Sequence, residues 1–207
     1  MKRSFVAILT LLMVACGGEQ ADSRTPQNEP EGDEVPAGST AESALGSRAD
    51  MTSEKVCEVL KSGVLNGVLD VNEESWTYRP ASEYVPQALC TANAQSPDGS
   101  SSYEVGLMIM KTDFESPAAA VESLESTVRS LTEGMTIEVA GKEHTTQVTF
   151  EPFMDGVGDQ AAWAPKLNEL SVADQGTRFA VTVQGTGDNA ENRAKAVELA
   201  HRIGDVL

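Results

Sequence analysis

The sequence lacks a hydrophobic run long enough to cross a membrane. A transmembrane helix needs roughly 20 apolar residues, whereas the longest apolar run here, Phe5–Val14, holds ten residues with Thr10 as its polar exception. Lys2 and Arg3 stand just before this run. A short apolar run behind a basic start is typical of a signal peptide. We therefore predict that residues 1–15 are a targeting signal and take no part in the fold.

Basic residues are scarce. Lys and Arg together number 15 against 32 Asp and Glu, which gives a formal net charge of −17 at pH 7. Such a charge repels the phosphates of nucleic acids and anionic lipid headgroups. We expect neither to be a partner, and the simplest role of the charge is solubility.

Histidine, a common metal ligand and catalytic base, is nearly absent. His144 and His201 are the two histidines, and neither stands in a pattern of neighbouring ligands or nucleophiles. A zinc site or a catalytic triad needs convergent partners that the sequence does not present. The stretch 155–159 has neither the glycine spacing of a phosphate-binding loop nor the acids of an EF-hand. We expect no metal, no cofactor and no catalytic residue, and we interpret 155–159 as a tight turn.

Aromatic residues make up 5% of the chain, and three of those in the domain gather in one proline-containing stretch. Trp76, Tyr78 and Tyr84 lie in that stretch, and Trp163 lies in a predicted strand. Aromatic side chains on a loop beside a sheet can line a pocket or a protein interface. These four are our candidate recognition residues. The alternative is that they form a lid over the edge of the core.

Cysteine is rare, and the first of the three cysteines closes the signal sequence. Cys16 follows Met13-Val14-Ala15, which resembles the lipobox of bacterial lipoproteins, although leucine is usual where Met13 stands. The resemblance implies that Cys16 becomes the acylated N-terminus and anchors the protein to a membrane. Family sorting habits make Gly17 after the cysteine an indication of the outer membrane. The alternative is an ordinary secretory signal with an incidental cysteine.

Large apolar residues are almost missing between Cys16 and Asp50. Val35 and Leu45 are the exceptions among Gly, Ser, Thr, Pro and acidic residues. Such a stretch cannot bury enough surface to offset its ordering entropy. We predict that residues 16–50 are an acidic disordered tether, spanning roughly 30 Å as a random coil. It serves either as a passive spacer or as a binding segment.

Residues 51–207 carry the periodic patterns of one domain. Helices are expected where a capping residue precedes apolar residues at helical spacing, and strands where apolar residues alternate. The expected helices begin at Thr52 or Ser53, Ser62, Ser116 and Asp188, and the expected strands cover 87–95, 103–111, 146–150, 160–164, 170–172 and 179–184. Met108 and Met110 make the second face of their strand apolar, and we interpret them as core filler. The order predicts an α+β class, with a two-layer antiparallel β-sheet flanked by helices.

The two remaining cysteines, Cys57 and Cys90, form an even pair once Cys16 is acylated. In an exported protein such a pair is expected to form a disulfide. It would tie the first helix to the sheet. A metal site or a nucleophile would need a histidine partner, which neither cysteine has nearby in the sequence.

Several of these features coincide in known proteins. The lipobox, the acidic linker, the cysteines of the first helix and first strong strand, and the motif at 156–161 resemble small lipoprotein domains of unknown function that are common in actinobacteria. More distantly, residues 51–207 resemble the two-layer fold of the photosystem II extrinsic (PsbP-like) subunits. The resemblance implies a fold and a location, but no reaction.

Three functions therefore remain in competition. The first is a non-enzymatic, lipid-anchored protein of the cell envelope, on the periplasmic face of the outer membrane, that binds or organises an envelope protein partner. The second is a carrier of a small apolar ligand, held between sheet and helix near the 76–84 stretch. The third is a periplasmic hydrolase, which would need an inward-facing cluster of Asp and His with shifted titration.

Overall fold

The computed structural model describes residues 47–82, 86–139, 142–185 and 187–207. The predicted signal peptide, the lipidation residue Cys16, most of the tether and the recognition candidate Tyr84 lie outside these residues. Residues 47–50, which we assigned to the tether, belong to the domain instead. They contain a short 3-10 turn, η1 (Arg48–Asp50).

Arg48 explains why the domain starts before the predicted boundary. The side chain is 7% exposed; its Nε donates to Thr177 Oγ1 at 3.1 Å, and its Nη2 donates to the carbonyl oxygen of Leu207 at 2.8 Å. The backbone N–H of Arg48 donates to Asp113 Oδ1 at 2.7 Å. These bonds join the first described turn to three distant parts of the chain, so a boundary drawn from composition alone falls too late.

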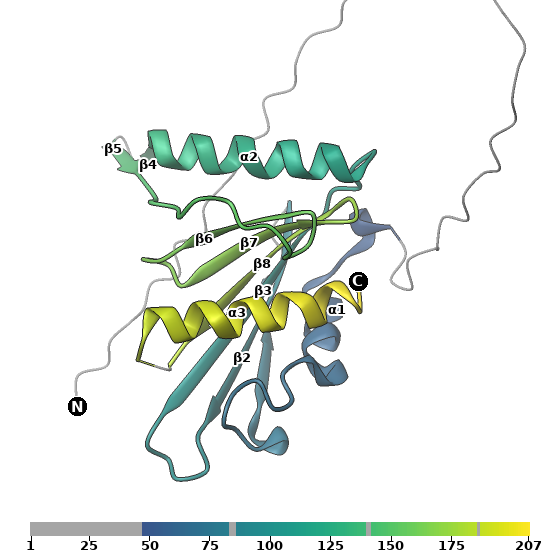
Figure 1. Cartoon of the computed structure of the whole chain (residues 1–207), viewed down its shortest axis with the longest axis vertical. Coiled ribbons are helices and arrows are strands. Elements are labelled where there is room, and N and C mark those ends of the chain that lie inside the picture. The colour runs from purple at the N-terminus through teal and green to yellow at the C-terminus, as the bar shows by residue number, and fades with distance from the viewer. Residues whose placement is uncertain (1–46, 83–85, 140–141, 186) are drawn as a thin grey trace, which may run out of the picture. The chain divides into compact units, whose positions relative to one another are not determined.

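The centre of the domain is a six-stranded sheet in which every neighbouring pair is antiparallel. It is built from two three-stranded meanders that meet through their third strands (Figure 1). The strands, in the spatial order β1-β2-β3-β8-β7-β6, are β1 (Thr77–Pro80), β2 (Gln87–Gln95), β3 (Ser102–Met110), β8 (Thr177–Gln184), β7 (Glu169–Asp174) and β6 (Gln160–Ala164).

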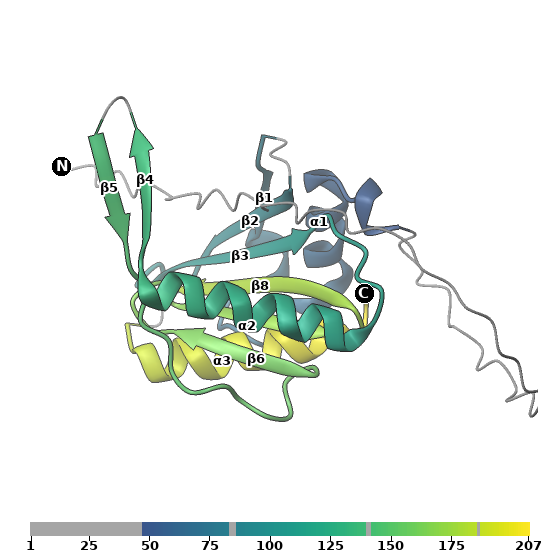
Figure 2. The ribbon, with the colours of Figure 1, turned by 90° about the horizontal axis from the view of Figure 1, so that it is seen from above.

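Helices lie on both faces of the sheet. One face carries α1 (Ser53–Val59), which continues into η2 (Leu60–Val64), and α3 (Asn189–Gly204). The 3-10 turn η3 (Glu73–Ser75) leads into β1. The other face carries α2 (Pro117–Glu133), as Figure 2 shows from that side. The predicted capping residues are confirmed, because the side chains of Thr52, Ser116 and Asp188 each accept a backbone N–H at their helix start.

The main core lies between the sheet and the pair α1 and α3. Alternate strand residues point into it, among them Leu107, Val181 and Trp163, each with no exposed surface. Cys57 of α1 and Cys90 of β2 form the expected disulfide, with their Cα atoms 5.1 Å apart. The disulfide ties the first helix to the sheet, as predicted.

The opposite face is covered over only part of its width. Ala120 and Leu124 of α2 pack on Ala173 of β7, and the helix lies over β7 and β8. The α+β antiparallel fold is therefore confirmed. The two-layer description holds for the β1–β3 half, whereas the β6–β8 half has three layers, because α2 and α3 enclose it.

Two predicted elements are wrong. The strand expected at 146–150 is replaced by a separate hairpin of β4 (Met135–Val139) and β5 (Lys142–Thr146), which stands away from the sheet beyond the end of α2 (Figure 2). The helix expected from Ser62 does not form, because Gly63 adopts a φ of 97° and turns the chain.

Both edges of the six-stranded sheet are protected against strand addition. Ala81 N donates to Leu89 O, so by antiparallel alternation Tyr78 and Pro80 are the β1 residues whose amides face outward. Pro80 has no N–H to offer. At the other edge, residues 151–154 of the chain itself pair with β6, where Met154 N donates to Ala161 O at 2.9 Å. A strand from a partner protein would therefore find few free backbone groups at either edge.

Candidate functional site

The predicted recognition aromatics do not form a common surface. Trp76 is 8% exposed and Trp163 is fully buried, and both belong to the main core. Tyr78 is half-buried against the core, with Lys61 Nζ 5.7 Å from its ring centroid. The alternative of a core lid therefore fits both tryptophans. Both indoles pack in the main core, and the apolar-ligand hypothesis stays a prediction.

The cluster that comes nearest to a catalytic arrangement lies at the turn between β7 and β8. Asp174 has a raised pKa, first because of burial and then because of Asp159 and Asp205, while His201 lowers it. His201 itself is exposed, on the last turns of α3. The other predicted histidine, His144, lies in β5.

The contacts of these residues stabilise the turn between β7 and β8. Asp159 Oδ2 accepts the backbone N–H of Gln175 at 2.8 Å, and the Asp174 carboxylate lies so close to α3 that a Cβ at position 204 would come within 2.6 Å of its Oδ2. Gly204 therefore permits the close approach. Among the residues that the structure describes, no group of three or more His, Cys, Asp or Glu side chains is placed to hold a metal.

The glycine-containing stretch 155–159 is a turn, as predicted. Gly156 and Gly158 have φ values of 78° and 58°, a region that favours glycine. A Cβ at Gly158 would lie 2.7 Å from the carbonyl oxygen of Ala173. The stretch is packed against β7.

Glu169 and Arg178 lie on the part of the sheet face that carries α2. Burial raises the pKa of the Glu169 carboxyl, and its recorded hydrogen-bond partner is Ser171 Oγ at 3.2 Å. Arg178 of β8 is also buried, and its Nη1 donates to Ser123 and Thr127 of α2. Neither residue was singled out by the sequence, where each is one polar position in an alternating strand.

The same face is uncovered beyond α2, over β1, β2 and β3 (Figure 2). Its apolar side chains are half-buried and lie among amide and hydroxyl groups, with Arg79 and Glu104 on the same face of the neighbouring strands. The apolar side chains are Leu89, Met108 and Met110, with Gln87, Thr91 and Asn93 on the same face of β2. We call this set the uncovered face. No helix among the described residues closes it.

The uncovered face corrects one sequence interpretation. Met108 and Met110 are not core filler, because both keep exposed surface, whereas Leu107 and Ile109 between and beside them have none. The available signal was the pattern of β3, which is apolar on both faces. The pattern does not indicate that α2 packs over β7 and β8 and leaves the same face of β1–β3 uncovered.

Comparisons of the chain with models of protein families, with curated proteins and with solved structures find no match. No helix in the described ranges is both long and apolar enough to span a membrane.

Proposed function

We propose that the chain is a lipid-anchored, non-enzymatic lipoprotein of the cell envelope, held on the periplasmic face of the outer membrane, whose domain binds a protein partner. The observation that carries this proposal is the uncovered face of β1–β3, with Leu89, Met108 and Met110 partly exposed.

The chemistry of the uncovered face suits a protein partner. Partly exposed apolar side chains at the centre with polar and charged groups toward the rim are typical of an interface. Leu89 and Met108 pair with each other, whereas Arg79 and Glu104 lie further along the same face. Methionine adapts its shape readily to a partner. Thr91 and Asn93 beside Leu89 can donate and accept hydrogen bonds.

The topology supports contact through a face. Pro80 and the paired segment 151–154 protect the sheet edges, so a partner that added a strand would find few free backbone groups. A face-on partner needs no backbone pairing. The predicted tether would let the anchored domain reach such a partner over roughly 30 Å.

A site-specific photo-crosslinker tests the proposal in cells that make the full-length protein. We expect a discrete adduct from Met108, and none from Glu122, an exposed residue of α2 that serves as the control. The crosslinked protein is identified by mass spectrometry and titrated, once purified, against the wild type and Thr91→Arg. Thr91→Arg should weaken binding at least tenfold while the thermal midpoint stays unchanged. Equal labelling at Met108 and Glu122, or equal affinity of both proteins, would overturn the proposal.

A further inference from the structure

A buried cation under α2 has no counter-ion among the residues that the structure describes. Arg178 is 6% exposed. Its Nη1 donates to the carbonyl oxygen of Ser123 at 3.1 Å, to Ser123 Oγ at 2.8 Å and to Thr127 Oγ1 at 3.0 Å. All three acceptors are neutral. None of the ion pairs in the described part of the chain includes Arg178.

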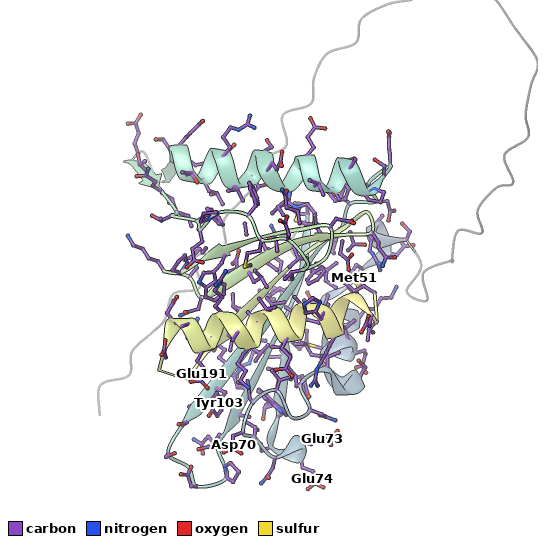
Figure 3. All side chains as sticks on the ribbon, in the orientation of Figure 1. Met51, Asp70, Glu73, Glu74, Tyr103 and Glu191 are labelled. Atoms are coloured by element: carbon purple, nitrogen blue, oxygen red, sulfur yellow. A yellow bond between two sulfur atoms is a disulfide. The ribbon has the colours of Figure 1, made fainter. Side chains whose placement is uncertain are left out.

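Acidic residues are abundant in this chain, yet none of the ion pairs in its described part brings one to Arg178. Glu125 is between Ser123 and Thr127 in the sequence, but its Oε1 accepts from Gln160 Nε2 on β6. Others are exposed, such as Asp70 and Glu73, which lie at the lower end of the view in Figure 3. A charge withdrawn from water without an opposite charge is unfavourable. Burial accordingly lowers the pKa of Arg178 to about 10.

The guanidinium keeps one edge unused. Nη1 donates to residues of α2, whereas Nε and Nη2 have no hydrogen-bond partner among the described residues. Neither Nε nor Nη2 is among the fully buried atoms that lack a partner. The Nε–H and one Nη2–H bond of arginine project in parallel, at the spacing of the two oxygens of a carboxylate. The unused edge is therefore the one suited to a bidentate acid.

The position of Arg178 on β8 adjoins the uncovered face. The antiparallel register pairs Ile109 with Phe179 and Met108 with Ala180, and its continuation by one residue places Met110 next to Arg178. Leu89 of β2 pairs with Met108. A ligand on the uncovered face would thus meet apolar side chains first and the guanidinium next to them, where low polarity strengthens a charge-assisted hydrogen bond.

We propose that the Nε–Nη2 edge of Arg178 binds one carboxylate of the protein partner, next to apolar side chains of the partner that lie on the uncovered face. This inference rests on the proposed function, because it names the chemistry by which the partner is recognised. A single carboxylate matches a single arginine. A doubly charged phosphate would stay half-neutralised in a chain with a net charge of −17.

Nuclear magnetic resonance on the full-length protein in detergent micelles tests the site directly. The probes are a blocked tripeptide, acetyl-Leu-Leu-Glu-amide, its uncharged twin acetyl-Leu-Leu-Gln-amide, and inorganic phosphate. We expect the Arg178 Nε–Hε resonance to shift with the glutamate peptide, at least tenfold less with the glutamine peptide, and less with phosphate. Equal shifts with the two peptides, or tighter binding of phosphate, would overturn the inference.

Variants separate the site from the stability of the fold. Arg178→Lys keeps the charge without the fork and should lose at least tenfold in affinity for the glutamate peptide. Because Arg178→Lys also loses bonds to α2, Met110→Glu provides a second test. An acid beside Arg178 should fill the fork, abolish peptide binding and raise the thermal midpoint, whereas Met108→Glu, one position further along this face, should not raise it. If Met110→Glu leaves peptide binding intact, the inference fails.

The two proposals can fail separately. If crosslinking from Met108 succeeds and the Arg178 resonance ignores the glutamate peptide, the face binds a protein but the carboxylate site is wrong. If the resonance responds and crosslinking fails, the carboxylate site stands without the protein partner that was to supply it, and the proposed function is overturned.

Discussion

At the scale of one residue, Glu169 shows how the sheet face that carries α2 changes the protonation of a carboxyl group. Glu169 pairs in register with Thr182 of β8, and its carboxyl accepts a hydrogen bond from Ser171 Oγ. Burial raises its pKa above the ordinary value of 4.5, and the Ser171 bond opposes that shift. The folded state therefore binds the Glu169 proton more tightly than the unfolded state does.

Glu169→Gln tests this expectation. Because the folded pKa is raised, the free energy of unfolding falls as pH rises from about 4.5 through the folded pKa. The neutral variant should therefore be more stable than the wild type at pH 7 and lose this advantage at pH 4, as urea unfolding at both pH values would measure. Glu122→Gln, on the exposed side of α2, should show no such pH-dependent gain. A Glu169→Gln advantage that is equal at both pH values would contradict the assignment.

Elements were predictable where local chemistry decides them. Ser116 accepts from Ala119 N at 3.2 Å and starts α2, and the turn at Asp98 closes the β2–β3 hairpin with Ser100 N donating to its Oδ1 at 3.0 Å. Both follow from capping and turn preferences. The β4–β5 hairpin was missed because Val148, which alternates with Phe150 in the sequence, instead bonds through its N–H to Leu131 O at the end of α2.

The uncovered face could not be predicted, since it depends on which strands α2 selects. Small residues on the α2 side, Ala120 and Ala173, let the helix approach β7. Periodicity identifies the buried stripe of a helix but not its partner strand. Arg178 was missed for the same reason, because its burial depends on the position of α2. Arg48 was missed because its partners Thr177 and Leu207 are distant in sequence.

The disulfide between Cys57 and Cys90 is expected to stabilise the contact between two elements of the fold. It joins α1 to β2 across a sequence separation of 33 residues. On the chain-entropy model, removing it should lower the free energy of unfolding by about 3–4 kcal/mol. Urea unfolding of the double variant Cys57→Ala/Cys90→Ala measures the loss, with reduced wild type as the matched control. Equal midpoints for the double variant and oxidised wild type would show that the bond adds no stability.

At the scale of the whole molecule, the chain combines a strongly acidic domain with a predicted lipid anchor. The formal charge of −17 disfavours direct contact with an anionic membrane surface. An acylated Cys16 would then supply the attachment, because several buried acyl chains hold a protein stably where one chain does not.

Cys16→Ser should move the protein from the membrane to the soluble fraction, because serine cannot carry the thioether-linked lipid. Fractionation of cells, followed by mass measurement of the extracted chain, checks this outcome. Ser39→Ala, a change of similar size within the predicted tether, should stay in the membrane fraction with acyl mass attached. Retention of Cys16→Ser in the membrane would place the anchor elsewhere.

The protected sheet edges acquire a further meaning on a crowded surface. Anchoring confines a protein to two dimensions and multiplies its encounters with its own copies, a condition under which open strand edges would stack into ribbons. Pro80 at one edge and the chain's own 151–154 segment at the other discourage that growth. The contact that we propose is face-on. An edge offers each newcomer another edge, whereas a face is used up by its first occupant, so the proposed binding mode predicts saturation and not polymers when the domain is densely packed.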